Sequence, residues 1–296
     1  MLLAAMTNFY YEHREDGKGH LESVRRTNAA GFKHIDFDMC AMVQNDGNEL
    51  CRDDWHKTVF EIKNEAEKLG VRFPQAHLPF PPHYSVWNSS NLLEQETSEH
   101  FRAMLERSIE IAGILGVKWG VVHPVQEHVS IELDFESDIA YNHEFYDYFF
   151  DLALKNNIGL AFENMFDTPK RRRFGVTSHE LIRLVESFKS DKTAICWDFG
   201  HGTRTFDNQI PHIEKVAKYL RATHVHDTIG LADLHTLPYL GTTEWARIMP
   251  VLGKIAYSGA FCFEVHRIER IPEPLRDKAV ALVHELGSYM ISLSET

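Results

Sequence analysis

The sequence predicts an α/β fold, a single (β/α)8 TIM barrel over residues 1–296. Short β-rich segments alternate with helical stretches along the whole chain, which is typical of βα units and a parallel sheet. Eight strand–helix pairs can be counted, and both that number and the chain length suit one closed barrel. No linker, low-complexity stretch or block of charge marks a second domain. An open doubly wound sheet is the alternative, but the Gly-rich phosphate loop that would support it is missing.

Each predicted element follows from a local pattern. Strands are expected at the short apolar segments 3–10, 33–39, 72–80, 118–124, 159–165, 193–201, 222–228 and 259–266. Helices are expected at 19–30, 53–69, 93–115, 139–156, 178–189, 210–220, 245–255 and 274–293. Gly70 is a suitable C-cap for the second helix, and Thr177 or Ser178 is a suitable N-cap for the fifth. The Pro-rich stretch 79–91 is too rich in turn-forming residues for a regular element and is the longest candidate lid.

Composition narrows the class of protein. The formal net charge of −12 argues against a protein that grips a phosphate backbone through many basic side chains. The four cysteines show no CxxC spacing, which suits a reducing cytoplasm. No segment approaches the roughly 20 apolar residues that span a bilayer, and the N-terminal stretch lacks the basic start of a signal peptide. We therefore expect a soluble cytoplasmic protein without membrane association.

Potential metal ligands lie at the carboxyl ends of six consecutive predicted strands. They are His77, His123, Glu163, Asp198, His224 and Glu264, and His201, Asp233 and His235 lie close to them in the sequence. In a (β/α)8 barrel these strand ends converge on one mouth. A lone histidine in a strand is more often a hydrogen-bonded core residue, and a lone acid often caps a helix. So many ionisable groups in one mouth would be costly without a cation, however, and Zn²⁺, Mn²⁺ or Co²⁺ suits these ligands.

The alternation of side chains along a strand adds a second expectation. If Glu163 points into the barrel, Ala161 does so too, and Phe162 points towards the helices. The same parity places Cys196 inside the barrel with Asp198. Small residues should therefore fill the barrel interior, and large residues should pack under the helices.

The only basic run in the chain follows the fifth predicted strand, at residues 171–173. Strand ends on this side of a barrel form sites, so these arginines could contact an anionic group of a substrate. A solvated surface loop is the more common arrangement, and it is the interpretation that the sequence favours.

Several motifs resemble those of the xylose isomerase-like barrel superfamily, in particular its sugar phosphate isomerase/epimerase and endonuclease IV branches. The motifs are FEN at 162–164, WDFGH at 197–201, HVHD at 224–227, DLH at 233–235 and FEVH at 263–266. The resemblance to the epimerases implies one divalent metal, usually manganese, on Glu163, Asp198, His224 and Glu264, with His201 binding substrate. The resemblance to endonuclease IV implies up to three zinc ions, because His77, His123, His201, Asp233 and His235 also match its ligands.

The resemblance implies a divalent-metal-dependent isomerase or epimerase of a sugar, sugar phosphate or polyol, with no nucleotide cofactor. Proton transfer would pass through a metal-stabilised enediolate, with Glu163 and Glu264 as base and acid and His201 assisting. His266 and Trp87 are expected to contact a small carbohydrate substrate. Members of this family are often oligomers, so a homo-oligomer is possible.

The sequence departs from the ketohexose 3-epimerases at two positions. Gly230 stands where their substrate-binding arginine would be, and Pro169 replaces a glutamate. Other functions therefore stay open: a zinc phosphodiesterase that acts on abasic DNA, a sugar dehydratase or lyase, and a metal-binding barrel without activity or within a larger complex. The acidic charge makes nucleic acid an unlikely partner.

Overall fold

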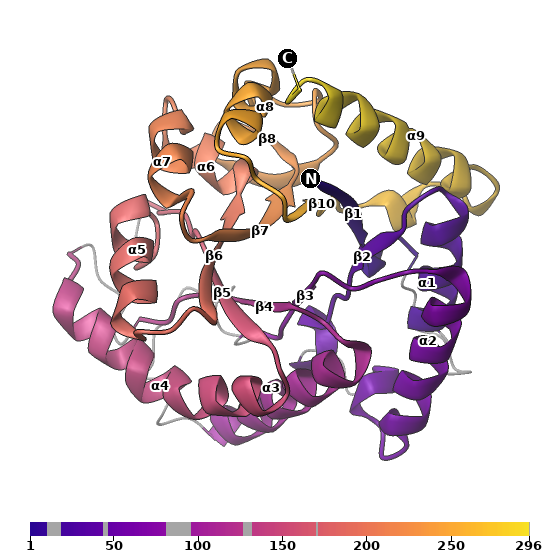
Figure 1. Cartoon of the computed structure of the whole chain (residues 1–296), viewed down its shortest axis with the longest axis horizontal. Helices are drawn as coiled ribbons and strands as arrows, with labels where there is room; N and C mark the ends of the chain where they lie inside the picture. Colours follow the sequence, from indigo (N-terminus) through magenta and orange to yellow (C-terminus); the bar gives the residue numbers. More distant parts are fainter. Residues whose placement is uncertain (11–18, 44–46, 81–95, 127–131, 170, 296) are drawn as a thin grey trace.

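Eight parallel strands form the centre of the computed structural model, and helices surround them (Figure 1). The structure describes residues 1–10, 19–43, 47–80, 96–126, 132–169 and 171–295. In chain order the barrel strands are β1 (Leu2–Met6), β2 (His34–Asp36), β3 (Gln75–His77), β4 (Trp119–Val122), β5 (Gly159–Glu163), β6 (Thr193–Asp198), β7 (Leu220–Val225) and β10 (Ala260–Phe263). They pair in the order β2-β1-β10-β7-β6-β5-β4-β3, and every pairing is parallel.

Backbone hydrogen bonds between the two end strands of this sheet close it into a barrel. Ile35 N donates to Arg72 O at 3.0 Å, and Met39 N donates to His77 O at 2.9 Å. These bonds join the chain around β2 to the chain around β3. The predicted (β/α)8 barrel is therefore confirmed.

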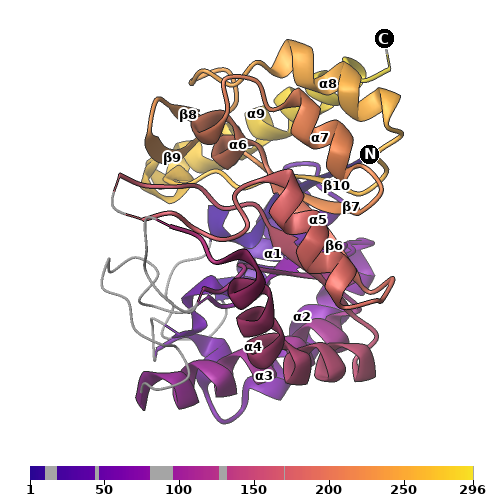
Figure 2. The same cartoon turned by 90° about the vertical axis from the view of Figure 1, so that its left-hand side faces the viewer.

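Helices cover the outside of the barrel on all sides (Figures 1 and 2). They are α1 (Gly19–Ala29), α2 (Trp55–Leu69), α3 (Glu96–Leu115), α4 (Phe135–Lys155), α5 (Ser178–Ser187), α6 (Phe199–Thr205), α7 (Ile210–Val216), α8 (Trp245–Lys254) and α9 (Glu273–Ser292). Gly70 ends α2 in the left-handed conformation, with φ 68°, as its C-cap role requires. Among the helices that the structure describes, none is long and apolar enough to cross a membrane.

The predicted parity of the strands is confirmed. Small residues pack together inside the barrel, where Ala161 and Cys196 belong to one buried cluster. Phe162 and Trp197 belong instead to the main core between the strands and the helices. This arrangement leaves the inner ends of β5 and β6 free to present polar side chains at the mouth.

Every predicted strand ends two to four residues earlier than expected, and in two cases the residues that follow form an element of their own. The strand predicted at 193–201 ends at Asp198, and α6 follows directly because the Asp198 side chain accepts a hydrogen bond from His201 N and so caps that helix. The strand predicted at 222–228 ends at Val225. A hairpin of β8 (Asp227–Ile229) and β9 (Ala232–Thr236) follows it, and the sequence analysis missed this hairpin. Gly230 lies in its turn with φ 59°, a conformation that favours glycine.

The first strand also ends early, at Met6, where a 3-10 turn (Thr7–Phe9) replaces the predicted continuation to residue 10. The candidate lid at 79–91 falls mostly on residues 81–95, which lie outside the described residues. Trp87, expected to contact substrate, lies outside them too.

Candidate metal centre

The carboxyl ends of β5, β6, β7 and β10 bring four predicted ligands together. They are Glu163, Asp198, His224 and Glu264, and one ligand atom from each lies within 4.8 Å of the others. All four side chains are buried. Barrel geometry explains the grouping, because Glu163 and Asp198 end their strands, His224 lies near the end of β7 and Glu264 directly follows β10.

His224 connects the two glutamates of this group. Its Nδ1 lies 3.0 Å from Glu163 Oε1 and 3.2 Å from Glu264 Oε2. On the other side of the ring, His224 Nε2 lies 3.5 Å from Asp36 Oδ2 at the end of β2. Asp36 is fully buried and also accepts a 2.7 Å hydrogen bond from Gln75 Nε2. The sequence analysis missed Asp36, although it also ends a strand at the mouth.

A second group of potential ligands shares Glu163 with the first. Glu163 Oε2 lies 3.2 Å from His123 Nε2 and 3.5 Å from His77 Nε2. His77 Nδ1 lies 2.9 Å from the carbonyl oxygen of Leu78. A carbonyl only accepts, so this hydrogen bond places the proton on Nδ1 and presents the Nε2 lone pair to the site.

A third group lies beside α6 and the β8–β9 hairpin. Asp233 Oδ1 lies 3.4 Å from His235 Nε2 and 3.7 Å from His201 Nε2. Both rings donate Nδ1–H to backbone carbonyls, His201 to Asn164 O at 2.8 Å and His235 to Glu264 O at 3.1 Å. Their Nε2 atoms therefore face the carboxylate, and each offers a lone pair to a metal ion once its Nε2 proton has left.

His226 joins this third group, and the sequence analysis missed it. The side chain is fully buried, and its Nε2 lies 2.9 Å from Asp198 Oδ2. A signal was present in the sequence, since residues two apart on an extended chain face the same side and His224 was already a candidate.

The residues of the first group fit a divalent cation. Glu163 Oε2, Glu264 Oε2 and His224 Nε2 are buried, and none has a hydrogen-bond partner among the described residues. Buried polar atoms without partners are costly, and carboxylate and imidazole donors suit Zn²⁺, Mn²⁺ or Co²⁺. A cation at this position would satisfy the two carboxylate oxygens, whereas His224 Nε2 faces Asp36 on the other side of the ring.

The pKa values of the cluster reflect burial and close charge. Burial raises the pKa of Glu264, whereas His224 and its neighbouring imidazoles outweigh burial at Glu163 and hold the pKa of that carboxyl well below its usual range. Burial lowers the pKa of His235, but the negative charges of Glu264 and Asp233 outweigh it and raise that pKa to about 9. The charged form of His235 is therefore favoured, and a cation that binds this ring would have to displace its proton.

A cavity of about 440 Å³ opens above the ligands. Its lining residues are His77, Phe80, His123, Glu163, Met165, Phe166, Arg173, His201, Arg204, Asp233, His235, Glu264 and His266. His266, which was predicted to contact substrate, lines this cavity and is exposed, and its ring stacks on His235 at 4.0 Å. Arg173 is only 9% exposed, so the solvated loop favoured for residues 171–173 is wrong for this arginine.

The buried cluster at the carboxyl ends of the strands is a group of side chains that could hold a metal ion, at the mouth of a (β/α)8 barrel. A family model described as xylose isomerase-like TIM barrel matches residues 24–285, and the chain belongs to this family. The resemblance found in the motifs is therefore confirmed.

Two curated relatives match parts of the chain. A probable endonuclease 4 of Mycoplasma mobile is 26% identical over 176 residues, which cover 57% of this chain and 58% of that protein. An uncharacterized protein of Sinorhizobium fredii, y4fM, is 32% identical over 82 residues, which cover 28% of this chain and 26% of that protein. The chain thus matches less than two thirds of the length of either relative.

Solved structures match over nearly the whole chain. A D-tagatose 3-epimerase-like protein has a TM-score of 0.73 at 17% identity and covers 100% of both chains. L-ribulose 3-epimerase has a TM-score of 0.74 at 14% identity, covering 100% of this chain and 95% of its own. The 3-keto-D-glucoside 4-epimerase of E. coli has a TM-score of 0.69 at 16% identity, covering 96% and 99%. At these identities the likeness establishes the fold alone.

Proposed function

We propose that this protein is a divalent-metal-dependent isomerase or epimerase that moves a proton beside the carbonyl group of a sugar, sugar phosphate or related polyol. The observation that carries the proposal is the pair of carboxylates in the cavity, Glu163 and Glu264, both within 3.2 Å of His224 Nδ1. The similar solved structures include sugar epimerases, and this supports the same reaction class.

The cation would be held by Glu163, Asp198, His224 and Glu264, whose grouped ligand atoms and orphaned oxygens suit it. When bound, Mn²⁺, Zn²⁺ or Co²⁺ supplies Lewis-acid polarisation of a substrate carbonyl and so acidifies the neighbouring C–H. Asp36 would act as a positioning residue, because it lies 3.5 Å from His224 Nε2 and fixes that ring from behind.

Glu163 and Glu264 would carry the proton. They reach the cavity from strands on either side of β7, so one carboxylate can remove a proton from a substrate carbon and the other can return one. His201 lies at the edge of the same cavity with Nε2 directed away from its backbone bond, and it would hold a substrate hydroxyl. His266 would contact the substrate at the rim.

The test is proton exchange. Ketoses, sugar phosphates and inositol-derived ketones would be incubated with manganese-loaded protein in D₂O, and deuterium at the carbon beside the carbonyl would be measured by mass spectrometry and NMR. We expect exchange together with a new isomer for at least one substrate. Metal content measured on the same preparation should be about one ion per chain, and absence of exchange across the panel would refute the proposal.

A second candidate function follows from the two additional ligand groups. His77, His201 and His235 all direct Nε2 towards carboxylates because backbone carbonyls hold their Nδ1 protons. Such pre-oriented rings favour a site with two or three zinc ions, which suits phosphodiester hydrolysis. Two or three zinc ions per chain together with cleavage of an abasic oligonucleotide would favour this phosphodiesterase over the isomerase.

A further inference from the structure

One wall of the cavity carries positive charge that the proposed chemistry does not use. Arg173, in the segment after β5, and Arg204, in α6, both line the cavity that contains Glu163 and His201. The rest of the cavity is rich in carboxylates and imidazoles. Two arginines in the same cavity as an acidic cluster, in a chain with a net charge of −12, call for a physical reason.

A single aromatic ring positions both arginines. The guanidinium carbon of Arg204 lies 3.7 Å from the centre of the Phe166 ring, and that of Arg173 lies 5.1 Å from it. The ring of Phe166 in turn lies 4.7 Å from the ring of His201. Stacking uses the flat face of the Arg204 guanidinium, so the N–H groups of Arg204, which lie in the plane, can bind a further group.

Arg204 forms no ion pair with a described residue, although the charge of Asp233 acts on it from a greater distance. Within the described parts of the chain no carboxylate lies within ion-pair distance of Arg204, and its buried Nε has no hydrogen-bond partner. The contrast is Arg172, which pairs with Asp167 at 3.2 Å and with Glu180 and so serves the loop itself. A buried donor without a partner is costly, and an oxyanion would satisfy it.

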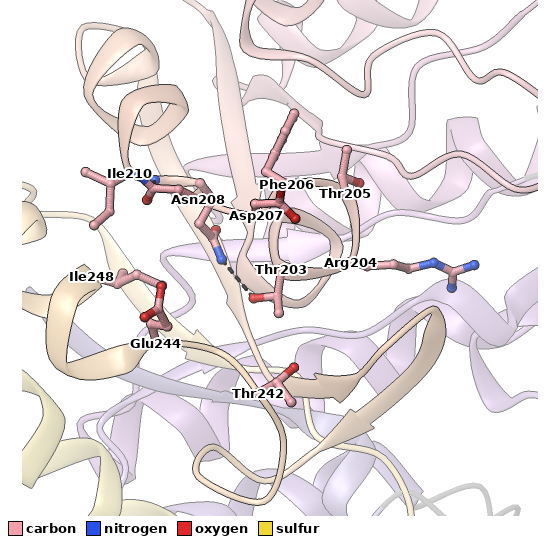
Figure 3. Close-up of a pocket in the computed structure, with 11 residues that line it drawn as sticks. Thr203, Arg204, Thr205, Phe206, Asp207, Asn208, Ile210, Thr242, Glu244 and Ile248 are labelled. Atoms are coloured by element: carbon pink, nitrogen blue, oxygen red, sulfur yellow. Dashed lines mark hydrogen bonds between the residues drawn. The ribbon is translucent and has the colours of Figure 1, made fainter.

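Figure 3 shows a second cavity that Arg204 also lines. A smaller cavity of about 270 Å³ lies between α6 and α8 and is lined by residues such as Thr203, Asp207 and Glu244. Gln209 donates a 2.9 Å hydrogen bond to Thr203 there, whereas the side chain of Arg204 extends away from the other labelled residues. Its guanidinium therefore belongs to the wall of the main cavity, beside Phe166.

We propose that Arg173 and Arg204 bind an oxyanion, a phosphate or a carboxylate, at the end of the substrate away from its reacting carbonyl. The inference rests on the proposed function and narrows it, because the substrate becomes a sugar phosphate or a sugar acid. Two forked guanidiniums suit the oxygens of such a group, and they offset the repulsion between an anionic substrate and the acidic cluster.

The experiment measures binding without turnover. Sorbitol, sorbitol 6-phosphate and gluconate share a polyol skeleton and lack a ketone or aldehyde, and each would be titrated calorimetrically into the metal-loaded, full-length protein. We expect one anionic ligand to bind at least about tenfold more tightly than sorbitol, as charged hydrogen bonds commonly provide. A preference for the phosphate identifies a sugar phosphate, and a preference for gluconate identifies a sugar acid.

Substitutions locate the origin of that preference. Arg204→Met and Arg173→Met should each reduce it to about threefold or less, whereas Arg25→Met, at an exposed position of α1, should preserve it with the same loss of charge. Arg204→Lys should be intermediate, since it keeps the charge but loses the fork. Metal content and circular dichroism would confirm that each variant is folded and loaded.

The results separate this inference from the proposed function. A wild-type protein without anion preference, or a preference that survives both Arg→Met substitutions because the metal alone provides it, overturns the anion site. If the preference depends on the arginines but no sugar exchanges a proton, the anion site is supported and the isomerase is refuted. If neutral sugars exchange protons and the arginine variants behave like wild type, the isomerase is supported and the anion site is refuted.

Discussion

Two buried carboxylates, Asp227 and Glu163, have opposite surroundings. Asp227 is fully buried, and four N–H groups donate to its oxygens at 2.9 to 3.0 Å. The donors are Thr228 N, Tyr239 N, Thr243 N and Trp245 Nε1. Glu163 is 1% exposed, yet it faces the ring nitrogens of His77, His123 and His224, and its Oε2 has no hydrogen-bond partner within the described ranges.

The difference distinguishes a structural carboxylate from one available for a site. Backbone N–H groups are fixed neutral donors, so Asp227 holds the loop between β9 and α8 in one conformation. Imidazoles can give up their protons to solvent and then offer lone pairs, so the groups around Glu163 can hold a cation. The number of N–H donors around a buried acid is therefore a criterion that separates the two roles in this barrel.

The largest expected effect is on turnover. Glu163→Gln keeps the shape of the side chain but removes the charge and the basic oxygen, so we expect proton exchange to fall by about 10³-fold or more, with a modest loss of metal. Exchange into D₂O and metal content per chain would be measured on the same preparation.

Full activity in Glu163→Gln would show that this glutamate takes no part in the reaction. The difference between Glu163 and Asp227 would then not identify a catalytic carboxylate. The matched control is Glu180→Gln, because Glu180 is another buried glutamate that accepts backbone N–H bonds, from Gly175 and Val176 at 2.9 and 3.0 Å. That variant should lose stability and retain turnover.

The next effect is on stability. Asp227→Ala leaves four buried donors without an acceptor, so we expect the free energy of unfolding to fall by about 3 kcal/mol. Urea titration followed by tryptophan fluorescence would measure it. Asp227→Asn retains one carbonyl oxygen and should lose about half as much. A loss below about 1 kcal/mol in the alanine variant would show that water replaces the carboxylate easily.

A smaller effect is expected when metal is added to chelator-treated protein. A cation that satisfies the orphaned oxygens of Glu163 and Glu264 should raise the free energy of unfolding by about 2.7 kcal/mol when its free concentration is a hundred times its Kd. Denaturation with and without Mn²⁺ or Zn²⁺ measures the gain. Glu264→Gln should reduce it, whereas Glu214→Gln, at an exposed position on α7, should not. Identical curves with and without metal would contradict the fit of the site.

The sequence predicts the barrel and most of the ligands for one physical reason. Parallel strands place their carboxyl ends at one mouth, so any acid or histidine that ends a strand is brought to the site whatever the details of packing. Glu163, Asp198, His224 and Glu264 meet for this reason. Their positions placed them among six candidates at strand ends, and the resemblance to the epimerases singled out these four.

The features that the sequence did not reveal depend on local competition or on segments between the strands. Asp198 ends its strand early because its side chain caps α6, a competition that hydropathy does not report. Arg204 and Phe166 come together across two separate segments, and no spacing in the sequence predicts that contact. The place of residues beyond the strand ends in the site therefore could not be predicted from the sequence and became clear only from the structure.

The smallest effect concerns Glu49, a third buried acid, which belongs to the Asp227 type. Its two oxygens accept 2.8 Å hydrogen bonds from the backbone N–H groups of Gly19 and His20, at the start of α1. Burial alone would raise the pKa of Glu49, but the His20 side chain and these N–H groups outweigh burial and hold that pKa below its usual range. Because the folded state has the lower pKa, the contribution to stability is complete above the unfolded pKa of about 4.5 and is lost as the pH falls through the folded pKa.

Glu49→Gln should therefore lower the free energy of unfolding by about 1 kcal/mol at pH 7, and this difference from wild type should shrink as the pH falls below about 4.5. Urea titrations of both proteins between pH 7 and pH 3.5 would measure it, with Glu61→Gln at an exposed position of α2 as the control. A difference that stays constant over this range would mean that the carboxylate charge does not stabilise the helix start. Glu49 would then stabilise the helix start through its shape alone. The number of N–H donors around a buried acid would then not indicate how much its charge contributes to stability.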